Sequence, residues 1–563
     1  MLNVGTTPQL FLDDLVIDRM EDCHRQLHRP TRYADNPVLA PDRPWELGPA
    51  RNGVYLFGGT VLFDEEEQLF RMWYRSSEVA AAEANGPIGD VPDGGYRSCY
   101  AVSQDGLQWE KPNLRMVAYG DVPETNILPP GSGGRRYIRR PNLVKDYDEP
   151  DPDRRYKMVY ATEVDGRWLL EKAFSPDGIR WRMSVGDPVF FPPPLSPLGI
   201  LFGWDPRLGQ YVHFHRQMTP GIPSDVDGRR VRAEAALMRS TSSNFEDWGD
   251  TEEVLRRDEQ IDPPLWDFGH AGLLGAILYT DDLYIGFLDT CTPHDVADVP
   301  DNLWGIYQHD HAEHRTELVI SRDGRRWTRV APHWEFMRRG LWGAWNSEFV
   351  ALSKPIVRND EVLIYYTGRN VPCGAQIVGH GQRHLLGMMR DGQPLAYAIG
   401  LAKLRLDGFA SIDGHDPGGT LTTRPLIFEG NRLVVNARAP SQRFGSSLPS
   451  REAFGRLRVA MLDAEGRPLA GYEESDCDPF SGDAVRHVVT WNGASDLGRL
   501  AGTPMRLRFS LRHAALYSFQ VLGAKGEPSW VNLLTPGSRG RPANRGRAHA
   551  PPGSGQPGVT ADG

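Results

Sequence analysis

One turn, S-x-D-G-x-x-W, occurs three times along the chain, at residues 103–109, 175–181 and 321–327. Asp105 and Asp177 are 72 positions apart, while Asp177 and Asp323 are 146 apart, close to twice that spacing. A degenerate copy at residues 240–248 fills the gap, with the tryptophan kept and the Asp-Gly pair lost. A recurring spacing of this kind is typical of repeat architectures.

Apolar runs on both sides of these turns predict β-hairpins, because an Asp-Gly turn needs positive φ, which glycine adopts freely. Further hairpins are predicted at residues 60–75, 142–162, 199–215, 275–289 and 354–368, the last followed by a strand within 397–409. Helical periodicity is almost absent. Five units of about four strands predict an all-β fold, a five-bladed β-propeller. The repeated turn is then structural: the serine and aspartate hold the turn, and the indole packs between sheets.

Composition narrows the classes of partner and compartment. The net charge is -10, which argues against general electrostatic binding of nucleic acid or of an anionic membrane. The five cysteines are scattered and show neither a disulfide framework nor metal-ligand spacing. The first residues lack the charge and apolar run of a secretory leader, so the cytoplasm is the expected compartment, with export by another route left open. No cofactor motif or metal site is predicted.

Three regions follow from the strand pattern. The propeller is expected over residues 1–410. Alternating apolar and polar residues, as in the segment 505–511, then predict a small β-sandwich over residues 411–525, which braces the propeller or holds a ligand weakly. Residues 526–563 are rich in Pro, Gly, Arg and Ser and are expected to be a disordered tail.

The N-terminal segment 9–30 is strand-like and precedes the first complete blade. In propellers a strand from one end of the chain often completes the sheet at the other end, so this segment is predicted to close the ring. Asp13 and Asp14 are adjacent on it, and adjacent strand residues point to opposite faces. They are therefore expected to serve the turn or the ring closure, not catalysis.

The five blades, the repeated turns, the FLDDLVID opening and the trailing sandwich resemble the five-bladed glycosidases of the invertase, inulinase and arabinanase group. The resemblance covers about residues 9–522 and is greatest to a divergent bacterial set similar to glycoside hydrolase family 32. It implies three carboxylates at the starts of the innermost strands. Two of them are missing: ARNGVY at residues 50–55 keeps Asn52 and Gly53 but lacks the blade-one aspartate, and Arg140 stands in place of the blade-two aspartate.

Replacement acids are available in segments that lead into other inner strands. Glycoside cleavage needs one protonated and one ionised carboxyl group flanking the glycosidic bond. Glu46 precedes blade one, Asp262 and Asp267 precede blade four with His270 beside them, and Glu348 opens blade five. We predict Glu348 as the leading general acid or base, followed by Asp267, Glu46 and Asp262. For His270 a hydrogen-bonded structural role is favoured over a catalytic one.

Aromatic and arginine side chains concentrate in the same segments. Indole and phenol rings stack on sugar rings, and arginines there would favour an acidic sugar, although core packing and a solvated loop explain them as well. The arginines are Arg51, Arg135, Arg136, Arg139 and Arg140. The predicted substrate-binding residues are Trp45, Arg51, Asn52, Tyr55, Arg140, Asn142, Trp266, His270, Trp342 and Trp345.

The segment HDHAEH carries His309, His311, Glu313 and His314 and is interpreted as a polar surface loop in preference to a metal site. Two functions remain open. The first is a glycoside hydrolase or transglycosidase acting on a carbohydrate, either neutral or acidic, at the mouth of the channel. The second is a propeller that binds a carbohydrate or a protein partner without chemistry. Sugar, linkage and oligomeric state stay undetermined.

Overall fold

The computed structural model describes residues 1–47, 52–77, 96–129, 139–164, 167–184, 195–218, 235–262, 267–293, 312–341, 343–370, 396–441 and 454–523. These ranges contain no α-helix, only strands and three short 3-10 helices: η1 (Pro44–Glu46), η5 (Pro152–Arg154) and η8 (Gly498–Leu500). The prediction of an all-β chain is confirmed. Within the same ranges, no helix has the length and apolar character needed to cross a lipid bilayer.

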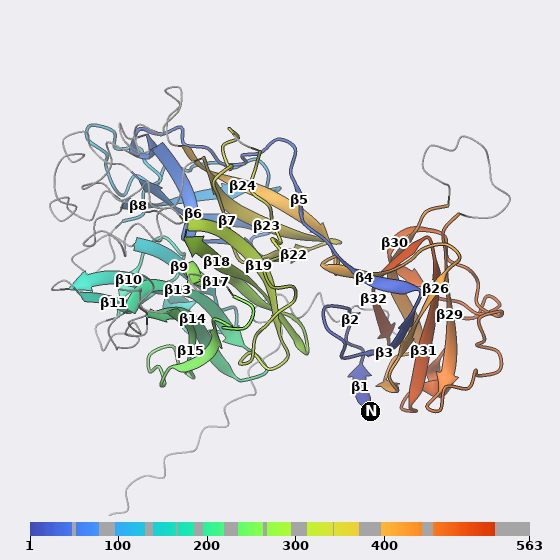
Figure 1. The fold of residues 1–563 in the computed structure, drawn as a ribbon. Helices are drawn as coiled ribbons and strands as arrows, with labels where there is room; N and C mark the ends of the chain where they lie inside the picture. The colour runs from blue at the N-terminus through green and yellow to red at the C-terminus, as the bar shows by residue number, and fades with distance from the viewer. Residues whose placement is uncertain are drawn as a thin grey trace, which may run out of the picture.

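The first part of the chain is a β-propeller (Figure 1). Blades two, three and four are separate four-stranded sheets in which consecutive strands pair antiparallel. Blade two contains β9 (Arg139–Lys145), β10 (Tyr156–Val164), β11 (Arg167–Ser175) and β12 (Arg182–Met183). Blade three contains β13 (Leu195–Asp205), β14 (Gln210–Met218), β15 (Ala235–Ser242) and β16 (Glu252–Arg256). Blade four contains β17 (Asp267–Thr280), β18 (Leu283–Pro293), β19 (Ala312–Ser321) and β20 (Thr328–Arg329).

The two remaining groups of strands, called blades one and five here, share one eight-stranded sheet. A parallel pair joins them, with Asn52 and Gly53 of blade one opposite Ala396 and Tyr397 of blade five. Blade one contains β6 (Asn52–Asp64), β7 (Leu69–Ser77) and β8 (Tyr96–Ser103). Blade five contains β21 (Phe349–Leu352), β22 (Ile356–Arg358), β23 (Glu361–Arg369), β24 (Ala396–Arg405) and β5 (Thr31–Arg32).

The repeated turn has the structural role expected of it. In the first copy the Ser103 hydroxyl bonds Asp105 at 3.0 Å, and the Asp105 carboxylate accepts the backbone N–H groups of Leu107 and Gln108, both at 2.8 Å. The Trp109 indole N–H donates to the Gly106 carbonyl at 3.2 Å. The copy at residues 175–181 repeats all of these bonds, and the degenerate copy forms them with Asn244 in place of aspartate. The copy at residues 321–327 repeats the bonds of its serine and aspartate, but not that of its tryptophan.

Gly106 shows why the turn needs glycine. Its φ is +75°, and a Cβ there would lie 2.5 Å from the Tyr365 hydroxyl of blade five. That hydroxyl donates to the Gly106 carbonyl at 2.7 Å, so the turn also links two blades. The Trp73 indole of blade one likewise donates to the Gly178 carbonyl in the turn of blade two at 2.6 Å.

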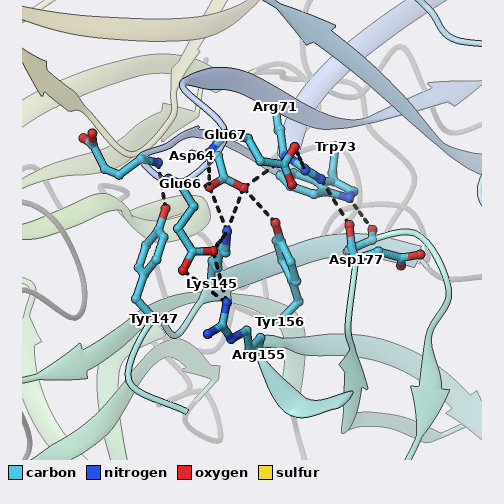
Figure 2. Close-up of polar contacts among 12 residues, drawn as sticks. Asp64, Glu66, Glu67, Arg71, Trp73, Lys145, Tyr147, Arg155, Tyr156 and Asp177 are labelled. Carbon is cyan, nitrogen blue, oxygen red and sulfur yellow. Dashed lines mark hydrogen bonds and ion pairs between the residues drawn. The ribbon is translucent and has the colours of Figure 1, made fainter. Parts of the chain in front are cut away.

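A second repeated contact, not predicted from the sequence, joins successive blades through buried aspartates. Each aspartate lies at the end of a blade's first strand and accepts a hydrogen bond from a tyrosine on the second strand of the next blade. The pairs are Asp64 with Tyr156 at 3.0 Å, Asp146 with Tyr211, and Asp205 with Tyr284 at 2.6 Å. Figure 2 shows the first pair, where Lys145 also donates to both oxygens of Asp64, at 2.7 and 2.9 Å.

The prediction that residues 9–30 close the ring is wrong. The segment that follows them closes it instead. β5, at Thr31–Arg32, pairs antiparallel with β24 as an outer strand of blade five. Asn36 then extends the attachment, because its side chain bonds both the N–H and the carbonyl of Leu401. The closing residues therefore begin one position after the predicted segment ends.

The strands before β5 belong to a second part of the molecule, which we call the two-sheet domain. Sheet A contains β1 (Leu2–Gly5), β3 (Ile17–Glu21), β26 (Gly419–Thr423), β27 (Leu426–Phe428), β29 (Arg456–Asp463) and β31 (Met505–Arg512). Sheet B contains β2 (Gln9–Leu10), β4 (Cys23–Leu27), β25 (Ala410–Gly414), β28 (Arg432–Ala439), β30 (Gly482–Val488) and β32 (Ala514–Leu522). One apolar core, with residues from both sheets, holds them together.

Asp407 lies where the propeller meets the two-sheet domain. It follows β24, is fully buried, and accepts hydrogen bonds from Tyr279 of blade four at 3.0 Å and from Ser518 of β32 at 2.5 Å. Burial raises its pKa to about 6, because hydrogen bonds from Ser518 and Tyr279 only partly offset the cost of desolvating the charge.

This raised pKa predicts a pH-dependent contribution to stability. The pKa of Asp407 in the folded protein exceeds its ordinary value of 3.8, so the folded state binds the proton more tightly than the unfolded state. This proton binding stabilises the fold fully below pH 3.8, and the stabilisation is lost as the pH rises through about 6. Asp407→Asn keeps a neutral side chain. We expect its free energy of unfolding to gain about 2 to 3 kcal/mol relative to wild type between pH 4 and pH 7.

Urea unfolding of both proteins at several pH values measures this gain. Asp416→Asn, at an aspartate whose side chain is 63% exposed, is the control and should show a much smaller trend. A stability difference between Asp407→Asn and wild type that does not change with pH would contradict the prediction.

Candidate functional site

The strands β6, β9, β13, β17 and β21 surround one narrow channel. Its lining includes Thr60 of β6, Leu143 of β9, Leu201 of β13, Gly275 of β17 and Leu352 of β21. The cavity there measures about 30 Å³, which is room for about two water molecules. A sugar does not fit in this part of the channel, so a carbohydrate site has to lie at an end of the first strands.

Lys354 also lines this cavity, just after β21. Its Nζ donates to the carbonyl of Phe202 in β13 at 2.6 Å, which links blade five to blade three across the channel. Burial lowers the pKa of Lys354 to about 8. The lysine thus helps to fill the channel and places a cation inside it.

Glu348 occupies the position expected of a channel-mouth acid. It immediately precedes β21, and its backbone N–H donates to the carbonyl of Arg369 at 3.0 Å, which fixes it at the start of the strand. The residue is half-buried, while Phe349 after it is buried. Among the described residues, none forms a hydrogen bond or an ion pair with the Glu348 carboxylate. This carboxylate is therefore available for a ligand.

A cluster of buried aromatic and arginine residues lies beside Glu348, where blades five and one meet. The Arg369 guanidinium donates to the Tyr397 hydroxyl at 2.8 Å and lies 4.6 Å from the ring of Phe349. Tyr397 packs on Tyr55 with ring centroids 5.2 Å apart, and Arg75 lies 4.9 Å from the ring of Tyr55. The predicted residue Tyr55 is thus enclosed by protein and is not an open platform for a sugar.

Arg75, Arg369 and Tyr397 were missed by the sequence analysis. The sequence feature that could have identified the two arginines is their place near the end of a mainly apolar strand, in LFRMWYRSS and in EVLIYYTGR. Gly53 permits the close packing here, because a Cβ at that position would lie 2.4 Å from the Cβ of Tyr397.

Glu46 lacks the solvent access that its predicted catalytic role requires. Glu46 lies in η1, is fully buried, and its carboxylate accepts hydrogen bonds from Lys111 at 2.6 Å, from Tyr74 at 2.6 Å and from two backbone N–H groups. Burial, together with the adjacent thiol of Cys99 and the Glu46 carboxylate, raises the pKa of Tyr74 well above its usual value. A carboxylate with four donors and no access to solvent is a structural ion-pair partner.

Asp262 is a structural carboxylate as well. Its side chain is fully buried and forms an ion pair with Arg329, which also binds Glu317 at 2.6 and 2.8 Å. His333 is a further partner of Asp262, at 3.2 Å. These contacts favour a structural role for Asp262 over the predicted catalytic one, because Arg329 already neutralises its charge.

Three predicted substrate-binding residues have packing roles. Trp45 is buried and donates to Asn126 at 2.9 Å. Asn142 bridges the first strands of blades two and three, donating to the Gly199 carbonyl at 2.8 Å and accepting from the Leu201 N–H at 3.1 Å. Trp345 stacks on Tyr366 with centroids 5.7 Å apart, so one face of its indole is covered by protein.

The remaining predicted residues belong to segments that lead into the first strands or to those strands themselves. Arg51, Arg135, Arg136, Trp266 and Trp342 lie outside the described residues. Arg139, Arg140, Asn52, Asp267 and His270 lie on described strands, but only their backbone is described. Asp267 is the first residue of β17, as Asn52 is of β6, which places both at the same end of the first strands as Glu348.

His314 is buried, and its Nδ1 lies 3.3 Å from the Asp289 carboxylate, so the surface-loop interpretation is wrong for this residue. His309 and His311 lie outside the described residues, as does the side chain of Glu313. Within the part of the chain that the structure describes, no three His, Cys, Asp or Glu side chains are grouped as metal ligands.

The propeller class is evident from the sheets themselves, and distant likenesses to solved structures exist. No protein-family model matches the chain, and no curated protein is similar to it. A glycosyl hydrolase from Bacteroides ovatus is 14% identical over 68% of this chain and 94% of its own, with a TM-score of 0.41. A β-1,2-mannobiose phosphorylase from Listeria innocua is 12% identical over 67% of this chain and 96% of its own, with a TM-score of 0.39. Likenesses this distant assign no activity to the chain.

Proposed function

We propose that this protein is a carbohydrate-active enzyme, a glycoside hydrolase or transglycosidase, whose site lies at the mouth of a five-bladed propeller channel. The supporting observation is the contrast among the candidate acids. Glu46 and Asp262 are buried and neutralised by cations, whereas Glu348, just before β21, is half-buried and has no side-chain partner among the described residues. A carboxylate kept unpaired among buried arginines and aromatic rings suits acid or base chemistry.

In the proposed mechanism, Glu348 acts either as the general acid that protonates the glycosidic oxygen or as the general base that takes a proton from the attacking water. Asp267, at the start of the neighbouring blade's first strand, is the second carboxylate. A separation of about 5 to 5.5 Å between the two would serve a retaining mechanism, and about 6.5 to 9.5 Å an inverting one. Arg75 and Arg369 contribute positive charge close to the mouth, which favours sugars that carry a carboxylate.

Glu348→Gln tests this proposal, because it keeps the shape of the side chain and removes its acid and base capacity. We expect it to lower kcat by about 10² to 10⁴ on any glycoside that the wild type cleaves. The substrate panel should contain aryl glycosides and oligosaccharides, including furanosides and uronides. Glu361→Gln, at an exposed glutamate paired with Lys403 in the same blade, is the matched control and should leave kcat unchanged. Unchanged turnover in Glu348→Gln would remove Glu348 from the mechanism.

The second candidate function is binding without chemistry, which the ion-paired states of Glu46 and Asp262 favour. In that case calorimetry would detect an oligosaccharide that binds at the mouth, while no member of the panel is cleaved. Glu348→Gln would then change the affinity for that oligosaccharide, and neither the variant nor the wild type would show turnover.

A further inference from the structure

The outer face of sheet A carries a row of arginines. On β31 the buried residues Leu507, Phe509 and Leu511 point into the core, so the alternating residues point outward. On β29 the same alternation buries Leu457 and Val459. The outward residues include Arg456, Arg458, Arg506, Arg508 and Arg512, with Arg19 of β3 opposite Thr422 on the far side. We call this set the arginine face.

The strand register concentrates this positive charge. Arg456 lies directly opposite Arg512, and Arg458 is opposite Ser510, which places Arg508 on the diagonal from Arg458. Successive outward residues on a strand are about 7 Å apart, and diagonal neighbours about 7 to 8 Å. Like charges directly opposite each other destabilise a sheet, so this arrangement costs stability unless an anion bridges it.

Only part of the arginine face is neutralised within the described chain. Three of its members have carboxylate partners: Arg19 with Glu21, Arg506 with Asp18, and Arg512 with Asp416. Among the described residues, no carboxylate pairs with Arg456, Arg458 or Arg508. The contact between Arg508 Nε and the Thr422 hydroxyl, at 3.4 Å, is with a neutral group. Three neighbouring guanidinium groups therefore have no carboxylate partner in the described part of the chain, and Arg508 still has its terminal N–H groups for a ligand.

The face is directed away from the propeller. Sheet B contacts the propeller through Ser518 to Asp407, through Asn436 and Asp483 to Arg405, and through Arg486 to Asp360. The loops that flank β2 add contacts of Thr7 with Asp281 and of Asp13 with Arg322. Figure 1 shows β29 and β31 on the side of the two-sheet domain remote from the blades. A ligand on the arginine face can thus be long without colliding with the channel mouth.

We propose that the arginine face binds an anionic polysaccharide through its carboxylate groups, and so holds the polymer on the protein while the propeller acts on it. This inference rests on the proposed carbohydrate function. Guanidinium groups match carboxylates with two parallel hydrogen bonds, and a flat sheet accommodates an extended chain. A nucleic acid is disfavoured because its denser charge meets a protein of net charge -10.

Calorimetric titration of the full chain with oligogalacturonate, and with a neutral mannooligosaccharide of equal length, tests the proposal. We expect binding of oligogalacturonate alone, weakening as salt rises. Arg456→Gln/Arg458→Gln should weaken it at least tenfold without loss of folding, because it relieves like-charge repulsion. Arg467→Gln/Arg499→Gln removes the same charge from exposed positions elsewhere in this domain and should leave the affinity unchanged.

The outcomes separate the two proposals. Glu348→Gln should retain oligogalacturonate binding even where it abolishes turnover, so failure of the catalytic proposal does not affect this one. The proposal would be overturned if both double variants weakened oligogalacturonate binding equally. It would also be overturned if the neutral mannooligosaccharide bound as tightly as oligogalacturonate. Tighter binding of a DNA duplex that is sensitive to Arg456→Gln/Arg458→Gln would overturn it too, and would assign the face to nucleic acid. A change of sedimentation coefficient in that variant without ligand would instead assign the face to self-association.

Discussion

Asp64→Ala is expected to lower the free energy of unfolding by about 3 to 5 kcal/mol, because it leaves the buried Lys145 without its buried counter-ion. Asp64 is fully buried between blades one and two, and it accepts hydrogen bonds from Lys145 and Tyr156 while Arg71 lies 3.3 Å away (Figure 2). Burial by itself would raise the pKa of Asp64. The hydrogen bond and charge of Lys145, with the bond from Tyr156, outweigh burial and hold that pKa below its usual value.

The neighbouring residue Glu66 supplies a matched control. It also contacts Lys145, at 2.8 Å, but its side chain is 46% exposed. Glu66→Ala should therefore cost about 1 kcal/mol or less. Chemical unfolding followed by tryptophan fluorescence measures both variants, since Trp73 and Trp181 lie in the core of this junction. Equal losses in Asp64→Ala and Glu66→Ala would show that burial does not decide the strength of this network.

Glu46→Ala is expected to destabilise the protein by a similar amount, about 3 to 5 kcal/mol, and to leave catalysis intact in the protein that remains folded. The substitution removes the buried partner of Lys111, whose side chain is only 4% exposed, and leaves the Tyr74 hydroxyl without its acceptor. Asp42, the other carboxylate at Lys111, is 63% exposed and cannot replace a buried charge.

Thermal and chemical unfolding measure the stability loss, and turnover of an identified glycoside measures the catalytic role. Glu124→Ala, which breaks the exposed ion pair with Arg115, is the control and should cost about 1 kcal/mol or less. A Glu46→Ala protein with wild-type stability and reduced kcat would restore Glu46 as a catalytic residue and contradict the structural interpretation.

The repeated turn and the hairpins could be predicted because their causes are local. The bonds of Ser103, Asp105 and Trp109 join residues at most three positions apart, so the motif itself carries the information. Alternation in β31 predicted a strand with one buried face for the same reason. The assignment of residues 2–27 to the two-sheet domain could not be predicted this way, because β3 and β4 pair with strands about 400 positions later.

The candidate acids also differ through contacts with residues distant in the chain. Glu46 and Glu348 both precede the first strand of a blade, and nothing adjacent to them in the chain distinguishes the two. Lys111 and Tyr74, which lie 65 and 28 positions from Glu46, neutralise it and exclude it from solvent. Around Glu348 the described neighbours supply no such partner.

The amino-acid sequence by itself determined the strands, the turns and their repetition, because φ preferences, side-chain alternation and hydrogen bonds over two or three residues act within a short segment. Only the tertiary structure decided which carboxylates are neutralised, which aromatic rings are covered and which arginines face solvent. Charge pairing and burial depend on groups brought together from different blades, and their free energies are set by that surrounding low-dielectric environment, not by the neighbours along the chain.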